Sequence, residues 1–491
     1  MGLLFSRTKS LNQLMNEATE SEKGLKRSLS ATNLVALGIG AIIGAGLFSL
    51  TGLAAANNAG PAVTISFLIG AIGCAFAGLC YAEFASMIPI AGSAYTYSYA
   101  TMGEFMAWII GWDLVLEYAL GAATVAISWS QYLVKFLHHF NIHLPAQLTA
   151  SPFETVTLMD GSTVHGFMNF PAILIVGALS LLLIRGTRES AFTNALLVAL
   201  KVTVVLVFIA VGWNHVNPDN YHPYIPENQG FGHFGISGVL RGAAVVFFAF
   251  IGFDAVSTAA QEAKKPQKDM PIGILGSLVI CTVLYVLFAH VMTGLANYKE
   301  FKDSAAPVAI AIAKTPYGWL QQAIILAILA GYTSVILVML MGQSRVFYSM
   351  SKDGLLPKTF SDVHPKYRTP YKSNLLFMVF VSLFSAFVPV HVVGEMVSIG
   401  TLFAFVLVCI GIIIMRKKQP DAPRPFRTPL VPFVPIMGII ICVVMMGALP
   451  WDTWLRLAIW MGLGFIIYFA YSKKNSKIGQ QSEQQSVAEK L

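Results

Sequence analysis

The chain has 491 residues, of which 56% are hydrophobic and only 11% are charged, and its mean hydropathy is +0.67. Soluble globular proteins carry about 25% charged residues. The composition therefore excludes an ordinary soluble enzyme and predicts an all-α polytopic membrane protein, since helices pair their own backbone groups in lipid. The first 28 residues are polar and contain no short apolar core with a cleavage site. We expect the first membrane span to anchor the chain.

Apolar runs of membrane-spanning length predict 12 transmembrane helices. The expected spans cover residues 30–57, 62–88, 104–137, 170–184, 190–213, 238–260, 271–296, 319–350, 373–389, 393–415, 431–449 and 454–471. Lysine and arginine gather after the fourth, sixth, eighth and tenth spans and beyond both ends of the set. The opposite loops hold few cations, mainly Lys299, Lys302 and Lys314. The positive-inside rule then predicts a multi-pass protein of the cell (inner) membrane with both termini cytoplasmic.

These spans divide the chain into five parts. We expect a cytoplasmic N-terminal tail (1–28), a first transmembrane repeat with helices 1–5 (29–213), a second repeat with its preceding loop and helices 6–10 (214–415), helices 11 and 12 (416–472), and a cytoplasmic C-terminal tail (473–491). Because each repeat has an odd number of helices, the second copy must be inverted in the membrane. The C-terminal tail is rich in Gln and Ser and is expected to be disordered.

The first span contains GIGAIIGAGLF (residues 38–48), with four glycines in nine residues. Each glycine weakens a helix by roughly 1 kcal/mol relative to alanine. Non-helical backbone at membrane depth is tolerated only against protein or a polar cavity, and the freed N–H groups there suit a carboxylate. Gly40 and Gly44 also form a GxxxG pair, so on this segment alone close helix packing explains the glycines equally well. A nucleotide-binding fingerprint fits poorly, because it would need glycine where Ile43 stands.

The sixth span is also interrupted in its middle, by Gly252 and Asp254 in the run VVFFAFIGFD (245–254). Gly252 alone is explained equally well by helix packing. Glycine-interrupted segments at corresponding positions of two halves, however, point to a transporter binding site. The two breaks together therefore favour a site between helices 1 and 6, each broken at mid-membrane.

Three stretches carry a specific family resemblance: GIGAIIGAGLF (38–48), YAEFASMIPIAGSAYTYSYA (81–100) and FFAFIGFDAVSTAAQEAKKPQKDMPIGI (247–274). They resemble the amino acid–polyamine–organocation (APC) superfamily and, within it, bacterial members of the cationic amino acid transporter (CAT) family. The likeness covers about residues 28–415. It implies the leucine-transporter (LeuT-like) fold with a 5+5 inverted repeat, and secondary transport of amino acids.

The resemblance also implies a substrate site built largely from backbone. A substrate carboxylate would lie on amides of the first break, and a substrate ammonium on carbonyls freed at the second. The residues of this site are Ile42, Ile43, Gly44, Ala45, Gly46, Phe248, Ala249, Phe250, Ile251, Glu117, Asp254 and Met339. Some relatives have Thr or Ser in place of Ala45 and Tyr in place of Phe250. For Met339, ordinary packing remains an equally good explanation.

Lys201 lies about eleven residues into the fifth span, or roughly 16 Å at 1.5 Å per residue, which is mid-bilayer. A lysine at that depth is costly unless it is paired or neutral, and snorkelling to an interface would need a long reach. Family members with a lysine at this position lack the sodium ion of their sodium-coupled relatives. The resemblance therefore implies that the Lys201 ammonium replaces sodium near residues 40–43, Thr333 and Ser334. Proton coupling through Lys201 follows as a hypothesis.

Acidic residues also lie inside the predicted spans. Asp113 and Glu117 share a helix face at i, i+4, and Asp254 follows the second break. These acids could balance Lys201, bind a cationic substrate side chain or pair with Arg345 or Lys264 at an inner gate. Glu83 is expected to anchor a gate or loop near the cytoplasmic face.

These observations predict a secondary active transporter of L-amino acids, cationic or small neutral, that works by proton-coupled symport and alternating access. An exchanger of the same fold remains open, as does a channel or a non-transporting sensor. No enzyme motif is present, and five cysteines without CxxC spacing predict no metal site. We expect no cofactor and no nucleic acid; the partners are the L-amino acid, the proton and the lipid bilayer. The sequence leaves open a small single-span helper subunit, the oligomeric state and the identity of the amino acid.

Overall fold

The computed structural model describes residues 7–9, 29–88, 93–157, 162–186, 191–302, 304 and 306–481. The predicted tail 1–28 therefore lies outside the described residues except at 7–9. Seven described helices are long and apolar enough to cross a membrane, and five shorter helices are also apolar. The protein is thus a predominantly helical, multi-pass membrane protein, as the composition predicts.

The bounds of the elements are as follows. The α-helices are α2 (Ala31–Ile42), α3 (Thr51–Ala54), α4 (Val63–Met87), α5 (Ser93–Thr101), α6 (Glu104–Val115), α7 (Gly121–His139), α8 (Phe170–Arg185), α9 (Ala191–Trp213), α10 (Gly235–Val246), α11 (Pro266–Leu295), α12 (Pro307–Ile312), α13 (Gly318–Lys352), α14 (Tyr371–Phe387), α15 (Val390–Lys418), α16 (Phe433–Ala448), α17 (Trp451–Ile467) and α18 (Lys473–Asn475). The 3₁₀ and π segments are η3 (Gly46–Leu50), η4 (Ala55–Ala59), η5 (Gly60–Ala62), η6 (Leu116–Leu120), η7 (Ala146–Leu148), η8 (Pro218–Tyr221), η9 (Phe247–Phe250), η10 (Asp254–Glu262), η11 (Tyr298–Phe301), η12 (Lys358–Phe360) and η13 (Tyr468–Ser472).

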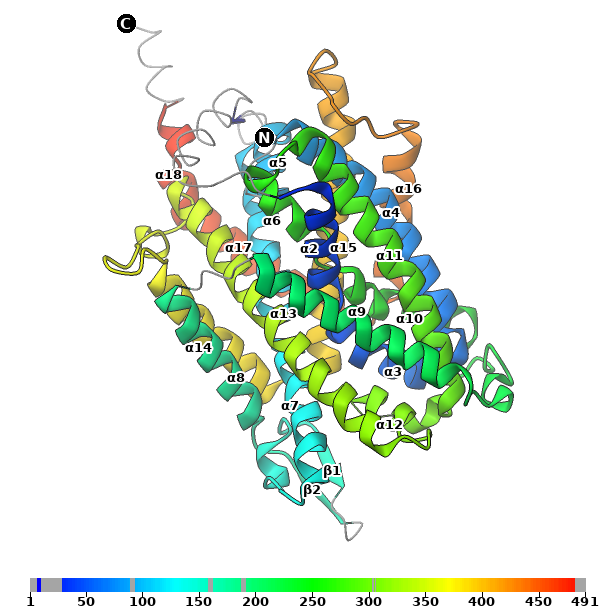
Figure 1. Ribbon diagram of the computed structural model, residues 1–491. Helices are drawn as coiled ribbons and strands as arrows, with labels where there is room; N and C mark the ends of the chain where they lie inside the picture. Colours follow the sequence, from blue (N-terminus) through cyan, green and yellow to red (C-terminus); the bar gives the residue numbers. More distant parts are fainter. Residues whose placement is uncertain are drawn as a thin grey trace, which may run out of the picture.

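The helix bundle has two distinct ends, one carrying α5 and α18 and the other carrying α12 and the β hairpin (Figure 1). Both described ends of the chain lie at the α5 end. The Lys9 ammonium is 2.6 Å from an Asp353 carboxylate oxygen just after α13, and the Asp353 carbonyl accepts a hydrogen bond from the Lys477 amide at 3.1 Å. The two chain ends therefore meet on one face of the molecule.

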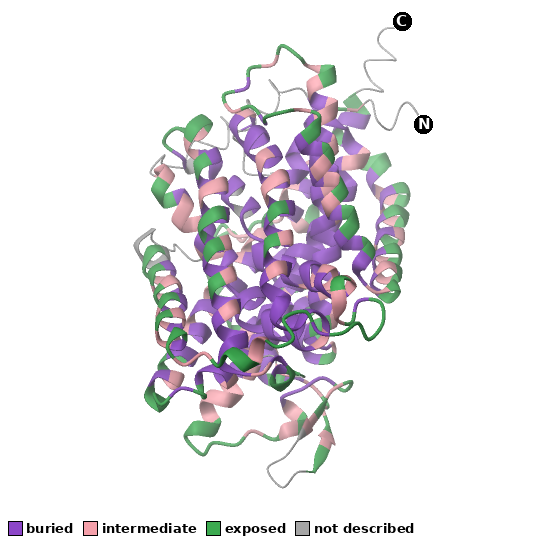
Figure 2. Cartoon of the chain, turned by 90° about the vertical axis from the view of Figure 1, so that its right-hand side faces the viewer, coloured by how far each residue is buried: buried purple, intermediate pink, exposed green. Residues whose placement is uncertain are grey.

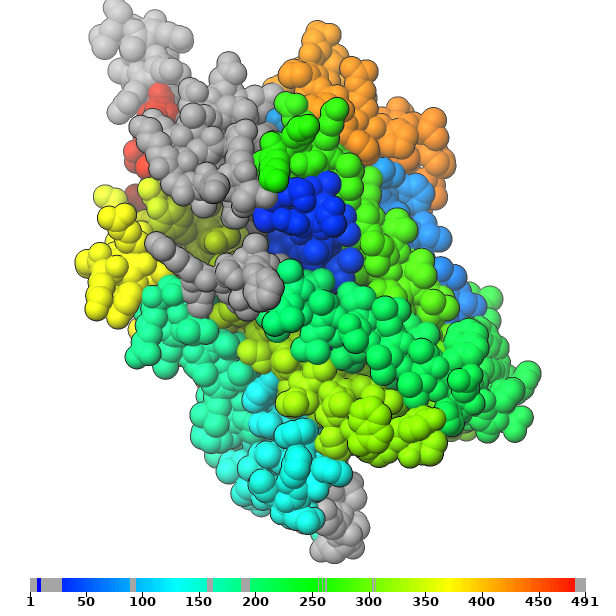
Figure 3. Space-filling model, in the orientation of Figure 1, coloured from blue at the N-terminus to red at the C-terminus, as the bar shows by residue number. Residues whose placement is uncertain are grey.

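Burial follows a simple radial pattern, with buried residues inside the bundle and exposed ones on its outer faces (Figure 2). Large apolar side chains are exposed along α16, including Ile436, Ile440 and Val444. An exposed apolar stripe on a helix of this composition suits lipid rather than water. Helix α2 reaches the surface on one face of the molecule, beside α9 and α11 (Figure 3).

Three parts of the structure differ from the sequence-based expectation. Helix α5 lies between the second and third spans, where no element is predicted, because Tyr95, Tyr97 and Tyr99 are buried by the surrounding helices. The polar stretch 138–169 contains an antiparallel hairpin of β1 (Thr155–Thr157) and β2 (Thr163–His165). The expected disorder after residue 472 is wrong for 473–481, which are largely helical and pack through buried Ser476; residues 482–491 lie outside the described residues.

Candidate functional site

The first break lies between α2 and η3. Helix α2 begins after Ser30, whose hydroxyl accepts from the Asn33 amide, and it ends at Ile42 because Ile43 adopts an extended conformation (φ −72°, ψ 105°). The backbone amides of Leu47 and Phe48 both donate hydrogen bonds to the Gly44 carbonyl, at 3.2 Å. The first span is therefore two half-helices joined by a short non-helical link, as its glycines predict.

The second break follows α10. The chain tightens into the 3₁₀ turn η9, extends at Ile251 (ψ 136°) and reverses at Gly252 (φ +115°) before η10 begins. Only glycine adopts that φ readily. A Cβ on Gly252 would also lie 2.9 Å from the carbonyl carbon of Ala41. The conformation and the close approach both require glycine at this position.

The two breaks touch each other through backbone. A Cβ on Gly46 would lie 2.2 Å from the Ala249 Cα. The backbone of the second break therefore packs directly against the backbone of the first break at Gly46. The hydroxyl of Tyr285, from α11, lies 2.9 Å from the Ile42 carbonyl oxygen and 3.0 Å from that of Ala249. Since one hydroxyl carries one proton, it shares its hydrogen bond between the two carbonyls. Tyr285 thus joins the two breaks. It is not among the site residues predicted from the sequence, although a tyrosine in the middle of an apolar helix needs a hydrogen-bond partner.

Lys201 reaches the end of the first half-helix from α9. Its ammonium donates to the Gly40 carbonyl at 2.6 Å, and the residue is 2% exposed. Its aliphatic stem packs against Gly331 of α13, where a Cβ would lie 3.3 Å from two stem carbons. Gly40 lies in the last turn of α2, and helix carbonyls near a C-terminus attract cations. The structure therefore places the Lys201 ammonium at the carbonyl end of α2.

Three buried acids lie near one another in the bundle. Asp113 on α6, Glu117 on η6 and Asp254 on η10 are each at most 1% exposed. Glu117 neighbours Asp254, and the Tyr118 hydroxyl donates to an Asp254 oxygen at 3.0 Å. Within the described residues, no hydrogen bond reaches either carboxylate oxygen of Asp113, whereas the Glu117 carboxyl lies beside the Asp254 carboxyl and Thr401. None of the ion pairs among those residues includes any of the three acids.

Glu83, near the C-terminal end of α4, has a different environment. Arg416 binds both of its carboxylate oxygens at 2.8 Å, and the Arg424 Nε lies 3.2 Å away. The Thr428 amide donates a further hydrogen bond at 2.7 Å. These partners tie α4 to the last turn of α15 and to the loop that follows it, which fits the loop anchor expected from the sequence.

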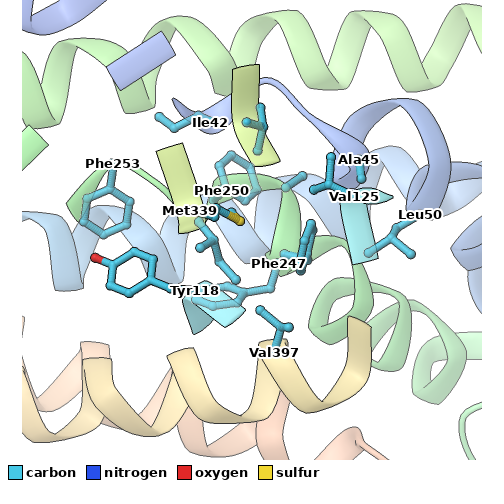
Figure 4. Packing of buried hydrophobic residues seen from close by; sticks show 14 of the residues in the cluster. Ile42, Ala45, Leu50, Tyr118, Val125, Phe247, Phe250, Phe253, Met339 and Val397 are labelled. Carbon is cyan, nitrogen blue, oxygen red and sulfur yellow. The ribbon is translucent and has the colours of Figure 1, made fainter. Parts of the chain in front are cut away.

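An apolar cluster surrounds the two breaks. Figure 4 shows side chains from the first break, η9 and α13 gathered with those of η6, α7 and α15. All the labelled members are largely buried: Ile42, Ala45, Leu50, Tyr118, Val125, Phe247, Phe250, Phe253, Met339 and Val397. Val335 of α13 contacts the first break, since a Cβ on Gly44 would lie 3.4 Å from it. Apart from Tyr285, Lys201 and Asp254 with its Tyr118 partner, the side chains around the breaks are thus mostly apolar.

The broken helices, the buried lysine and the buried acids in a multi-pass helical bundle define a membrane transport protein. The comparisons identify the family. Residues 29–468 match the family described as "Amino acid permease". The chain belongs to this family of amino acid permeases, within the APC superfamily, and it is a permease rather than an enzyme.

Three bacterial relatives cover almost the whole chain. The chain is 47% identical over 477 residues (96% of this chain and 99% of the relative) to the "Branched-chain amino acid permease BcaP" of Bacillus subtilis. It is 42% identical over 463 residues (94% and 97%) to the "Methylthioribose transporter" of the same organism. It is 35% identical over 463 residues (93% and 97%) to the "Branched-chain amino acid permease BcaP" of Lactococcus lactis.

Proposed function

We propose that the protein is a secondary active transporter of neutral L-amino acids that works by alternating access and is driven by protons. The observation that carries this proposal is the 2.6 Å hydrogen bond from the buried Lys201 ammonium to the Gly40 carbonyl. A charged donor makes a stronger hydrogen bond than a neutral one. Protonation of Lys201 would therefore hold the end of α2 in place, and loss of the proton would release it.

The substrate main chain would bind at the two breaks. We assign the carboxylate to the amides of Ile42, Ala45 and Gly46, because the amides at the start of a half-helix stabilise negative charge. The ammonium would meet the carbonyls of the second break, at Phe248, Ala249 and Ile251. The Tyr285 hydroxyl already contacts the Ala249 carbonyl, so this tyrosine would orient that carbonyl for the substrate; Ile43 and Gly44 would supply the bend between the half-helices.

The substrate side chain would enter the apolar cluster beside Phe250 and Met339. Two relatives are named for branched-chain amino acids and one for methylthioribose. Branched-chain amino acids carry a branched alkyl group and methylthioribose carries a methylthio group, and both groups are small and apolar. The polar parts of the two kinds of compound, an amino acid main chain and a sugar, differ completely. We therefore propose valine, leucine and isoleucine as the substrate class, selected by an apolar pocket that buries the side-chain end.

Glu117 and Asp254 would form a second titratable site on the cytoplasmic side of the substrate. Both acids are buried and neighbour each other, and burial of two charges so close together is costly unless one carboxyl is protonated. We propose that this pair carries a proton during transport. A cationic substrate side chain is the other group the pair could bind, and the substrate panel below separates the two roles.

The membrane arrangement is part of the same proposal. The seven long and five shorter apolar helices would make 12 crossings of the cell membrane with both termini cytoplasmic, which agrees with the meeting of residues 7–9 and 472–479 on one face. Helices 1–5 (29–213) and 6–10 (214–415) would form the inverted repeats, with helices 11 and 12 in 416–472. Both broken helices would then begin the two repeats, which is where the observed breaks lie.

Uptake by purified protein in liposomes tests the proposal. We expect labelled leucine, isoleucine and valine to accumulate only with an inward proton gradient, and Lys201→Ala to abolish that accumulation. The exposed Lys302 provides the matched control, since Lys302→Ala should transport normally. Uptake that ignores the gradient but needs preloaded amino acid would replace symport with exchange. A preference for lysine or arginine would mean that Glu117 and Asp254 bind the substrate side chain. The absence of transport of any amino acid by folded protein would overturn the proposal.

A further inference from the structure

Gly121 opens α7 and has an ordinary helical backbone. Its φ and ψ are −56° and −47°, which alanine adopts without strain, and glycine inside a helix costs about 1 kcal/mol relative to alanine. The conformation therefore gives no reason for glycine here. The surroundings do, because a Cβ on Gly121 would lie 2.7 Å from the sulfur of Met339 and 3.3 Å from its terminal methyl carbon. The missing side chain makes room for the end of Met339.

Met339 connects this contact to the substrate site. It lies one helical turn after Val335 on α13, so the two residues share a face, and Val335 is the residue that contacts Gly44 in the first break. Three residues after Met339, α13 also packs closely on η6, which directly precedes α7: a Cβ on Gly342 would lie 3.4 Å from the Tyr118 ring. Met339 is buried, at 7% exposed, and lies in the cluster with Ile42, Ala45 and Phe250 (Figure 4).

We propose that Gly121 determines the size of the substrate side chain that this permease accepts. Gly121 lets the end of the flexible thioether of Met339 lie against α7, and so leaves space beside the two breaks for a branched aliphatic side chain. A methyl group at position 121 displaces the thioether, because an atom cannot remain 2.7 Å from a Cβ and interiors leave few voids to absorb it. The displaced methionine then occupies the space that the substrate side chain needs. This inference rests on the proposed function, since it names the specificity control of the same site.

The test compares Gly121→Ala with wild type in liposome uptake of leucine, isoleucine, valine and alanine. We expect kcat/KM for leucine and isoleucine to fall by about tenfold or more, which is the effect of one methylene in an apolar pocket, while alanine uptake changes little. The double variant Gly121→Ala, Met339→Ala should restore leucine uptake, since it removes the displaced side chain. An equal fall for all substrates, or no rescue by the double variant, would overturn the proposal.

The chain offers two matched controls. Gly177 in α8 and Gly462 in α17 are helical glycines whose added Cβ would have no atom within 4 Å, so alanine at either position should leave the substrate ranking unchanged. If Gly121→Ala does not fold, Met339→Ala provides the test. Truncation of Met339 should enlarge the side-chain pocket and raise the uptake of phenylalanine relative to leucine. An unchanged order of substrate preference would overturn the proposal. Failure of the proposed function is distinguishable, because wild type would then transport none of these amino acids.

Discussion

Glu83 and Glu117 are two buried glutamates on neighbouring parts of the same bundle, and their environments are opposite. Glu83 is 0% exposed and has two arginines and a backbone amide as partners. Glu117 is 1% exposed, neighbours a second acid at Asp254, and is in none of the ion pairs within the part of the chain that the structure describes. The charge of the Glu83 carboxylate is balanced by two arginines, whereas a charge on Glu117 would lie beside another acid.

The physical consequence of this difference is a division between structural and functional acids. A buried charge with its partners in place contributes little net stability, but removal of one partner is strongly destabilising. A buried carboxyl without partners costs folding free energy, so its retention calls for another explanation, and perturbed acids gather at functional sites. We therefore expect substitutions at Glu83 to unfold the protein and substitutions at Glu117 to change transport.

The largest expected effect is that of Glu83→Ala. It leaves Arg424, whose side chain is 2% exposed, without its carboxylate, and breaking a buried pair costs about 3–5 kcal/mol. We expect a clear fall in the melting temperature in detergent and a loss of folded protein. The exposed pair Asp362–Lys372 is the control, because Asp362→Asn should leave the melting temperature unchanged. If Glu83→Ala melts like wild type, Glu83 is not the anchor that the geometry indicates.

Tyr285→Phe should have a smaller effect on stability and a specific effect on transport. The change removes the hydroxyl shared by the Ile42 and Ala249 carbonyls, and a buried acceptor that loses its donor costs about 1–3 kcal/mol. We expect weaker apparent affinity for leucine in concentration-dependent uptake. Tyr81→Phe is the control, since within the described residues no hydrogen bond involves the Tyr81 hydroxyl. Equal uptake by both variants would contradict a role for Tyr285 in joining the breaks.

Glu117→Gln should affect transport rather than stability. A neutral amide of the same size removes an uncompensated buried carboxyl, so the melting temperature should stay the same or rise. Proton-driven accumulation of leucine should fall several-fold, while exchange of internal for external leucine continues. Both measurements use the same liposomes with and without the gradient. A large fall in the melting temperature would show that Glu117, like Glu83, has a structural role.

The smallest stability effect is expected for Gly331→Ala. The added methyl group would lie 3.3 Å from the Lys201 stem, which is tight but can be relieved by movement of a flexible chain, and alanine favours the helix. Stability should therefore change little. Because the Lys201 ammonium is displaced from the Gly40 carbonyl, the pH dependence of leucine uptake should shift while exchange persists. An unchanged pH profile would show that the position of the ammonium does not control coupling.

The amino-acid sequence by itself determined the membrane class and indicated two interrupted spans. Glycines within an apolar span weaken the helix locally, but helix packing explains either set of glycines alone equally well, and α2 continues through Gly38 and Gly40 before it ends at Ile42. The exact position of the first break was therefore decided by the structure. The depth of Lys201 along its span is equally a local property. The family, too, could be inferred from three stretches of sequence.

Only the tertiary structure decided which groups meet. The crossing of Gly46 and Ala249, the shared hydroxyl of Tyr285 and the contact of Gly121 with Met339 join residues from different helices, and no pattern within one helix predicts the partner on another. The same holds for α5 and residues 473–481, whose helical structure is stabilised by burial against distant segments rather than by local preference. The sequence predicts different roles for Glu83 and Glu117, but only the structure shows that Arg416 of α15 and Arg424 of the following loop reach the Glu83 carboxylate.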